Sequence, residues 1–186
     1  MPRVLIPHAE IEARVAVLAE RISRDYEGKE PILIGVLKGV IFFFAELVMK
    51  MSIPTKMDFI RAASYGSGST SSGVIRILKD VELPLKGKDV ILVEDIVDSG
   101  LTLDRMIRHL DAKEPASIKI CALIDKSERR TKEVRIDYSG FEVAGGFLVG
   151  YGLDYDEKYR HLPDICTLEL NGASDPNKED THDRRV

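Results

Sequence analysis

Residues 90–102 read VILVEDIVDSGLT, and this stretch decides the fold that we expect for the chain. It opens with a short apolar run, which is typical of a strand buried on both faces of a parallel sheet. Glu94 and Asp95 follow where the strand should end, and the turn DSGLT leads into a helical pattern over 103–110. In open α/β sheets, ligands bind beyond the carboxyl ends of the strands, where a helix N-terminus offers free N–H groups to an anion. The sequence therefore predicts a phosphate-binding turn in an α/β fold.

The same turn carries carboxylates, which should repel a phosphate, while a helix terminus contributes only about 0.3–1 kcal/mol of attraction at an exposed site. The conflict disappears if the ligand also carries hydroxyl groups and a divalent cation, because carboxylates accept hydrogen bonds from a ribose diol and bind Mg²⁺ directly or through water. A sugar phosphate fits better than a triphosphate or a dinucleotide, since the chain has neither a P-loop nor a complete G-x-G-x-x-G motif. By spacing alone, an ordinary turn capped by Asp98 or Ser99 is the alternative.

Length and composition narrow the class of protein. The chain has 186 residues and a formal net charge of −4, which suits one domain and argues against a general nucleic-acid partner. We expect no membrane partner either, because no apolar stretch is long enough to span a bilayer and the N-terminal segment is too short for a secretory signal. Cys121 and Cys166 lie in apolar runs without C-x-x-C spacing, so we expect reduced core cysteines in a cytoplasmic protein.

Alternating strand and helix patterns predict a parallel, twisted sheet flanked by helices, with a small lobe formed by the chain ends. A helix over 40–51 is apolar almost all round, so it must be enclosed in the domain or lie partly at a subunit contact. The polar, glycine-rich segment 64–73 predicts a mobile loop. Apolar residues almost vanish from Gly172 onward, so we expect a single domain over 1–171 and a disordered tail over 172–186.

Other strand ends supply residues that suit the same ligand. Gly39 would let the backbone approach closely, and Lys38 could meet an anion, although a solvated lysine at a helix start is as common. Lys126 can only donate hydrogen bonds, so it would select a carbonyl oxygen over an amino group. Phe147 could stack on a planar base and Arg160 could bind a phosphate, although a core phenylalanine and a solvated arginine are the commoner cases.

Together these motifs resemble the type I phosphoribosyltransferases. VEDIVDSGLT looks like the phosphoribosyl pyrophosphate signature of that family, and the likeness runs from Leu5 to about Leu170. Four further pieces resemble its hypoxanthine-guanine branch, most of all the bacterial members: LKG at 37–39, SYG at 64–66, DK at 125–126 and FLVGYGLDYDEKYRHLP at 147–163. The resemblance implies the type I phosphoribosyltransferase fold, with a core and a small hood lobe from the chain termini.

The resemblance also implies a reaction. A 6-oxopurine, hypoxanthine or guanine, attacks C1′ of phosphoribosyl pyrophosphate, which gives the nucleoside monophosphate and pyrophosphate and requires Mg²⁺. Asp98 is then the general acid/base at purine N7. Glu94 and Asp95 face the ribose hydroxyls and a metal-bound water, and Asp154 helps to place the second Mg²⁺ near the purine 2-position. A homodimer or homotetramer follows from the same likeness and from the apolar helix.

The remaining residues carried over from the family fall into four groups. The phosphoribosyl group contacts Glu94, Asp95, Asp98, Ser99, Gly100, Leu101 and Thr102. Pyrophosphate contacts Leu37, Lys38, Gly39 and Arg160, and the Leu37–Lys38 peptide can be cis in the family. The purine contacts Lys126, Phe147, Leu148 and Asp154. The loop that closes over the site includes Ser64, Tyr65 and Gly66.

Three rival interpretations conflict with the sequence. An RNA-binding attenuator on the same fold would need a basic surface, whereas this chain is net acidic. An adenine phosphoribosyltransferase conflicts with Lys126, since adenine presents an amino group where lysine needs an acceptor. An α/β protein without a site would make four motifs at the strand ends a coincidence. The ranking of hypoxanthine, guanine and xanthine stays open.

Overall fold

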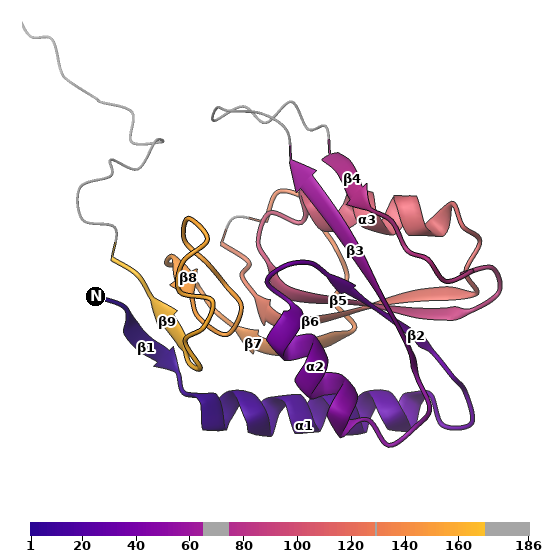
Figure 1. Ribbon diagram of the computed structural model, residues 1–186, viewed down its shortest axis with the longest axis horizontal. Helices are drawn as coiled ribbons and strands as arrows, with labels where there is room; N and C mark the ends of the chain where they lie inside the picture. Colours follow the sequence, from indigo (N-terminus) through magenta and orange to yellow (C-terminus); the bar gives the residue numbers. More distant parts are fainter. Residues whose placement is uncertain (65–74, 129, 170–186) are drawn as a thin grey trace, which may run out of the picture.

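The computed structural model describes residues 1–64, 75–128 and 130–169. Its main sheet has the strand order β4-β3-β2-β5-β6-β7 (Figure 1). The strands are β2 (Ile32–Val36), β3 (Lys56–Ser64), β4 (Ile75–Lys79), β5 (Asp89–Val97), β6 (Ser117–Asp125) and β7 (Tyr138–Glu142). All neighbours pair in parallel except β4, which is antiparallel to β3. The expected parallel sheet is confirmed, and β4 adds one antiparallel strand at its edge.

Helices cover both faces of this sheet. The helices α1 (His8–Asp25) and α2 (Ile41–Lys50) lie together on one face, and α3 (Leu101–Asp111) lies on the other (Figure 1). Along β5, Ile91 and Val93 join the apolar cluster under α1 and α2, while Val90 and Leu92 join the cluster under α3. All four side chains are fully buried, and each such burial stabilises the fold by about 1.5–3 kcal/mol. The run at 90–93 is therefore a strand buried on both faces, as predicted.

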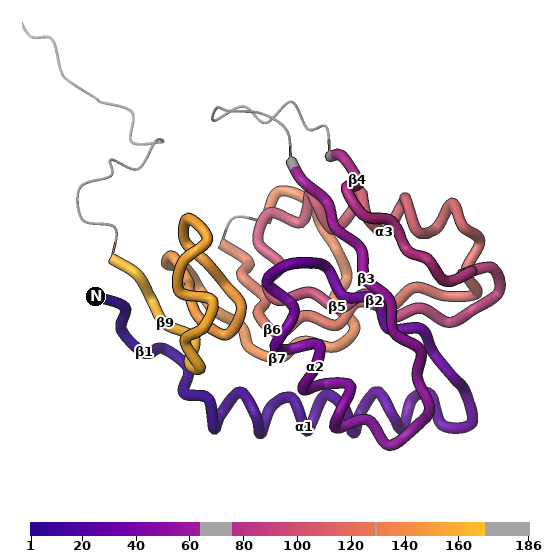
Figure 2. The backbone as a smooth tube through the Cα atoms, in the orientation of Figure 1, coloured from indigo at the N-terminus to yellow at the C-terminus, as the bar shows by residue number. Residues whose placement is uncertain are grey.

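A second, smaller sheet joins the two ends of the described chain. It has the order β1-β9-β8, from β1 (Arg3–Ile6), β9 (Ile165–Thr167) and β8 (Leu148–Val149), and both pairings are antiparallel. The backbone tube shows this sheet standing beside the carboxyl edge of the main sheet (Figure 2). It forms the lobe that was expected from the chain ends.

The end of β5 differs from the expectation. Strand β5 does not end before Glu94 but continues to Val97, because its backbone pairs with β6 as far as Asp125 irrespective of side-chain polarity. The described residues leave Phe42 and Met49 of α2 exposed at 45% and 78%, so a partial subunit contact stays the prediction for this helix. Cys121 and Cys166 are free and buried, as predicted. Among the helices that the structure describes, none has the length and apolar character needed to span a membrane.

Candidate active site

Parallel pairing places the ends of β2, β5 and β6 at one edge of the sheet. Lys38 and Gly39 follow β2, Asp98 follows β5 and Lys126 follows β6. Two neighbouring pockets open at this edge, with volumes of about 260 Å³ and about 160 Å³. Asp98 and Ile96 line both of them, so a ligand that fills both would pass Asp98.

The smaller pocket lies at the N-terminus of α3. It is lined by Ser99, Gly100 and Thr102, among others, and Gly100 has the left-handed φ of 80° that lets the chain turn into the helix. The N-cap residue of α3 is Gly100, which has no side chain to cap the helix. The Ser99 hydroxyl accepts only a long 3.4 Å bond from the N–H of Leu101. The alternative of a turn capped by Asp98 or Ser99 is therefore weak, and the first N–H groups of α3 are available to an anion.

The larger pocket combines a cation, a carboxylate and an aromatic ring. Lys126 is only 7% exposed, and its Nζ lies 3.9 Å from Oδ2 of Asp98. The other Asp98 oxygen, Oδ1, is buried without a hydrogen-bond partner among the described residues. Phe147 and Leu148 line the pocket, and Phe147 is 39% exposed with its ring edge-on to Tyr155. These groups suit a flat ring that presents an acceptor and a donor side by side.

Glu94 and Asp95 form an acidic pair at the back of the pockets. Burial, followed by repulsion from Asp95, raises the pKa of Glu94 well above its usual range. Burial also raises the pKa of Asp95 to about 6, although backbone N–H groups partly oppose the shift. Within the part of the chain that the structure describes, Glu94 Oε2 is buried without a partner. A buried acidic pair of this kind needs a cation or hydroxyl donors to stabilise its charge. A sugar diol with a bound Mg²⁺ would supply both.

The described residues contain no cluster of three metal-binding side chains. A cation at this edge would therefore need oxygens from its ligand as well as from Glu94, Asp95 or Asp154, which is the usual mode for Mg²⁺ beside phosphates. The carboxylate of Asp154 lines the larger pocket and already pairs with Arg160, at 2.7 Å from Oδ1 to Nη2.

The turn after β2 packs tightly against its neighbours. The Leu37–Lys38 peptide is cis. A Cβ atom on Gly39 would overlap Oδ2 of Asp95, and one on Gly152 would overlap the carbonyl oxygen of Gly39. Only glycine fits at these two positions, so the turn is held directly against the acidic pair.

Two cations line this turn, and both are paired with acids. Lys38 Nζ lies 2.7 Å from Oε2 of Glu157, and Arg160 Nη2 lies 3.4 Å from the same oxygen. Arg160 also donates through Nη1 to the carbonyl of Gly152 at 2.7 Å. The sequence did not single out Glu157, which is one acid among several in the run DYDEKYR.

The other predicted residues are placed as follows. Leu101 is the first residue of α3 and is 42% exposed, outside the lining of both pockets. Ser64 ends β3, whereas Tyr65, Gly66 and the tail 172–186 lie outside the described residues. Sequence reasoning also missed Arg130, which donates to the backbone of the acidic turn. No local motif marks it, because its acceptors lie about 30 residues earlier in the chain.

Residues 5–156 match the family model described as a phosphoribosyl transferase domain. The chain belongs to the phosphoribosyltransferase family. It is 45% identical over 169 residues to the hypoxanthine phosphoribosyltransferase of Salmonella typhimurium, covering 90% of this chain and 95% of that protein. It is also 45% identical to the hypoxanthine-guanine phosphoribosyltransferase of Mycobacterium bovis, covering 89% of this chain and 85% of that protein.

Solved phosphoribosyltransferase structures agree with the sequence comparison. A crystal structure of a hypoxanthine-guanine phosphoribosyltransferase from Bacillus anthracis superimposes with a TM-score of 0.86 at 42% identity, covering 89% of this chain and 98% of that one. A hypoxanthine phosphoribosyltransferase from Staphylococcus aureus gives a TM-score of 0.86 at 35% identity, over 90% and 91% of the two chains. The resemblance inferred from the motifs and the expected fold class are both confirmed, and the chain lies in the hypoxanthine-guanine branch.

Proposed function

We propose that this phosphoribosyltransferase transfers the 5-phosphoribosyl group from phosphoribosyl pyrophosphate to N9 of hypoxanthine or guanine in purine salvage, releasing IMP or GMP and pyrophosphate. One observation carries the choice of base: the ammonium of Lys126 and the carboxylate of Asp98 lie 3.9 Å apart in one pocket. On a 6-oxopurine, O6 and N7 are neighbours on the same edge of the ring. Lys126 donates to O6 while Asp98 accepts the proton at N7, and Phe147 stacks on the ring while Leu148 offers its backbone.

Asp98 acts as the general base when N9 attacks C1′. As the N9–C1′ bond forms and the bond to pyrophosphate breaks, the ring becomes positively charged and its N7 proton moves to Asp98. Such proton transfer contributes about 10²–10⁴-fold to the rate. Holding purine and sugar in register can supply roughly a further 7–11 kcal/mol by removing the entropy cost of their encounter.

The sugar phosphate occupies the smaller pocket and the acidic pair. The turn from Asp98 to Thr102 wraps the 5′-phosphate, mainly through the free N–H groups at the start of α3. Because backbone groups do this work, the exposed side chain of Leu101 is not required for it. Glu94 and Asp95 accept hydrogen bonds from the ribose hydroxyls.

Members of this family generally use Mg²⁺. In this chain Glu94, Asp95 and Asp154 would hold the ion together with substrate oxygens, and the bound ion would neutralise charge on the departing pyrophosphate. Lys38 and Arg160, with Leu37 and Gly39 in the same turn, bind pyrophosphate. Exclusion of water from the reactive sugar is the role proposed for the closing loop expected at Ser64, Tyr65 and Gly66, of which the last two lie outside the described residues.

A competition assay tests this function. The protein is incubated with phosphoribosyl pyrophosphate, Mg²⁺ and an equimolar mixture of hypoxanthine, guanine, xanthine and adenine, and the nucleotides are separated by chromatography. We expect IMP and GMP but no AMP, and loss of product when EDTA removes the metal. AMP as the main product, or no nucleotide at all, would refute the proposal.

We further propose a homodimer or homotetramer that acts in the cytoplasm, with a single domain over 1–171. Ile41, Phe42 and Met49 leave an exposed apolar stripe on α2, which a second copy would cover. Sedimentation should show a mass above that of one chain, and Phe42→Glu should lower this mass.

The domain boundary has its own test. Truncation after Asn171 should leave activity and melting temperature unchanged if the tail lies outside the domain.

A further inference from the structure

We propose that Arg130 is a positioning residue, which locks the phosphate-binding turn and the purine-binding strand end together as one rigid unit. This inference rests on the proposed function, because it assigns a cause to the spacing of Asp98 and Lys126. Arg130 lies in the connection between β6 and β7, far along the chain from the turn that it holds.

One guanidinium reaches three acceptors, two at and just after the end of β5 and one at the end of β6. Its Nε donates to the carbonyl of Asp98 at 2.9 Å, and Nη2 donates to the carbonyl of Val97 at 3.1 Å. Nη2 also bonds Oδ1 of Asp125, the residue that precedes Lys126. The side chain of Arg130 is only 12% exposed, so these bonds are poorly accessible to competing water.

The two residues after Arg130 continue the same contact. The N–H groups of Thr131 and Lys132 both donate to the carbonyl of Ser99 at 3.0 Å, and the Thr131 hydroxyl donates to it at 3.2 Å. A Cβ atom on Gly100 would overlap the carbonyl oxygen of Lys132. Residues 130–132, which we name the brace, therefore lie directly beneath the turn from Val97 to Gly100.

The brace supports the two groups that meet the base. The carbonyl of Val97 accepts hydrogen bonds from the N–H of Lys126 at 3.0 Å and from Nη2 of Arg130. The backbone that carries Asp98 and the backbone that carries Lys126 are therefore both bonded at Val97. Without the guanidinium, two carbonyls and the Asp125 carboxylate lose their charged donor and the turn can shift. A lysine could not replace it, because a single ammonium lacks the planar fork that reaches acceptors in different directions.

The test compares Arg130→Ala and Arg130→Lys with the control Arg135→Ala, since the side chain of Arg135 is 89% exposed and, among the described residues, pairs with the nearby Asp137. We expect Arg130→Ala to lower kcat and raise KM for both phosphoribosyl pyrophosphate and hypoxanthine. The loss in kcat/KM should be about 10²-fold, which is what a misplacement of about 1 Å between reacting groups can cost. Arg130→Lys should recover little, whereas added guanidinium ion should partly restore Arg130→Ala. Arg135→Ala should match the unmodified chain.

Calorimetric binding of IMP gives a readout that does not depend on turnover, because IMP carries both the purine and the 5′-phosphate. Binding should weaken in Arg130→Ala and, to a smaller extent, in Asp125→Asn, which keeps the shape of the side chain and serves if the alanine variant does not fold. The inference is overturned if Arg130→Ala, or Asp125→Asn where only that variant folds, lowers the melting temperature but leaves kcat, both KM values and IMP binding unchanged. If the unmodified chain makes no IMP, the proposed function fails instead.

Discussion

Replacing Lys126 by methionine should remove the preference of the pocket for a 6-oxopurine. Methionine keeps the length and apolar stem of the lysine but has no donor for O6. Because Lys126 is 7% exposed and lines the larger pocket, water cannot readily take over its role. The change therefore tests the single group on which the choice between oxo and amino purines depends.

The expected size of the effect follows from the contacts of the ammonium. Its nearest acid, Asp98, is 3.9 Å away, which is beyond a normal hydrogen bond, so the donors of Nζ remain available for a ligand. A hydrogen bond to a charged group contributes about 1.5–3 kcal/mol. At about 1.36 kcal/mol per decade, kcat/KM for hypoxanthine should fall roughly 10- to 150-fold.

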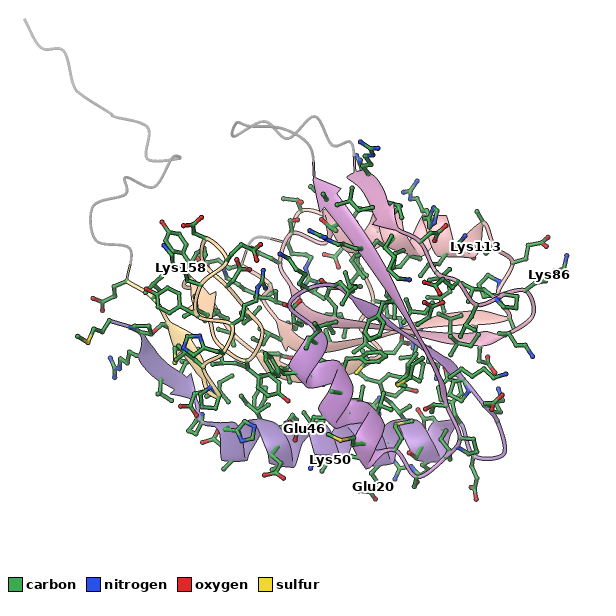
Figure 3. The ribbon with its side chains drawn as sticks, in the orientation of Figure 1. Glu20, Glu46, Lys50, Lys86, Lys113 and Lys158 are labelled. Carbon is green, nitrogen blue, oxygen red and sulfur yellow. The ribbon has the colours of Figure 1, made fainter. Side chains whose placement is uncertain are left out.

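Steady-state rates with hypoxanthine and with adenine should be measured for both chains, at saturating phosphoribosyl pyrophosphate. The rate with hypoxanthine should fall while the rate with adenine does not, so the ratio of the two rates becomes smaller. Lys86→Met is the matched control, because Lys86 is exposed and pairs with Glu114. It lies at the opposite end of the molecule from Lys158, the neighbour of Glu157 in the sequence (Figure 3). An equal fall for both bases, or no fall for hypoxanthine, would refute the assigned role of Lys126.

Three further changes have distinct expected outcomes. Asp98→Asn should lower turnover about 10²–10⁴-fold in steady-state kinetics, with KM for the sugar phosphate retained; unchanged turnover would remove Asp98 from the base role. Gly39→Ala should displace Asp95 and destabilise the fold by about 1–3 kcal/mol in urea unfolding, and an unperturbed protein would contradict the close packing. Burial raises the pKa of Asp80, but hydrogen bonds from Lys113 and His109 outweigh it and bring the value to about 2. This stabilisation is complete above the unfolded pKa and is lost as the pH falls through about 2, so Asp80→Asn should cost about 1 kcal/mol at neutral pH, allowing for solvent screening at this exposed site, and little near pH 2. A cost that does not change with pH would contradict this assignment.

Much of the site was predictable because parallel topology brings strand ends to one edge. Once 90–93 was identified as a buried strand, Lys38, Asp98 and Lys126 had to lie near one another, and the structure brings them to the same edge. The end of β5 was not predictable from polarity, since backbone pairing with β6 carries it past Glu94 to Val97.

Contacts between distant segments were beyond the reach of sequence patterns. Glu157 meets Lys38 across 119 positions, and Arg130 meets the carbonyl of Asp98 across 32. Neither residue type is unusual where it stands, and only the folded course of the chain gives it an acceptor or a donor. The sequence predicts that α2 is apolar almost all round, but it does not show which of the apolar side chains of α2 are exposed.

The small sheet has a consequence for how the enzyme is made. Leu148, in the wall of the larger pocket, belongs to β8, which pairs with β9, and β9 in turn pairs with β1. Strand β1 therefore lacks its pairing partner until the chain has been synthesised as far as Thr167. Until that segment emerges, the nascent chain has an incomplete wall in the larger pocket, so activity requires synthesis of every residue up to Thr167.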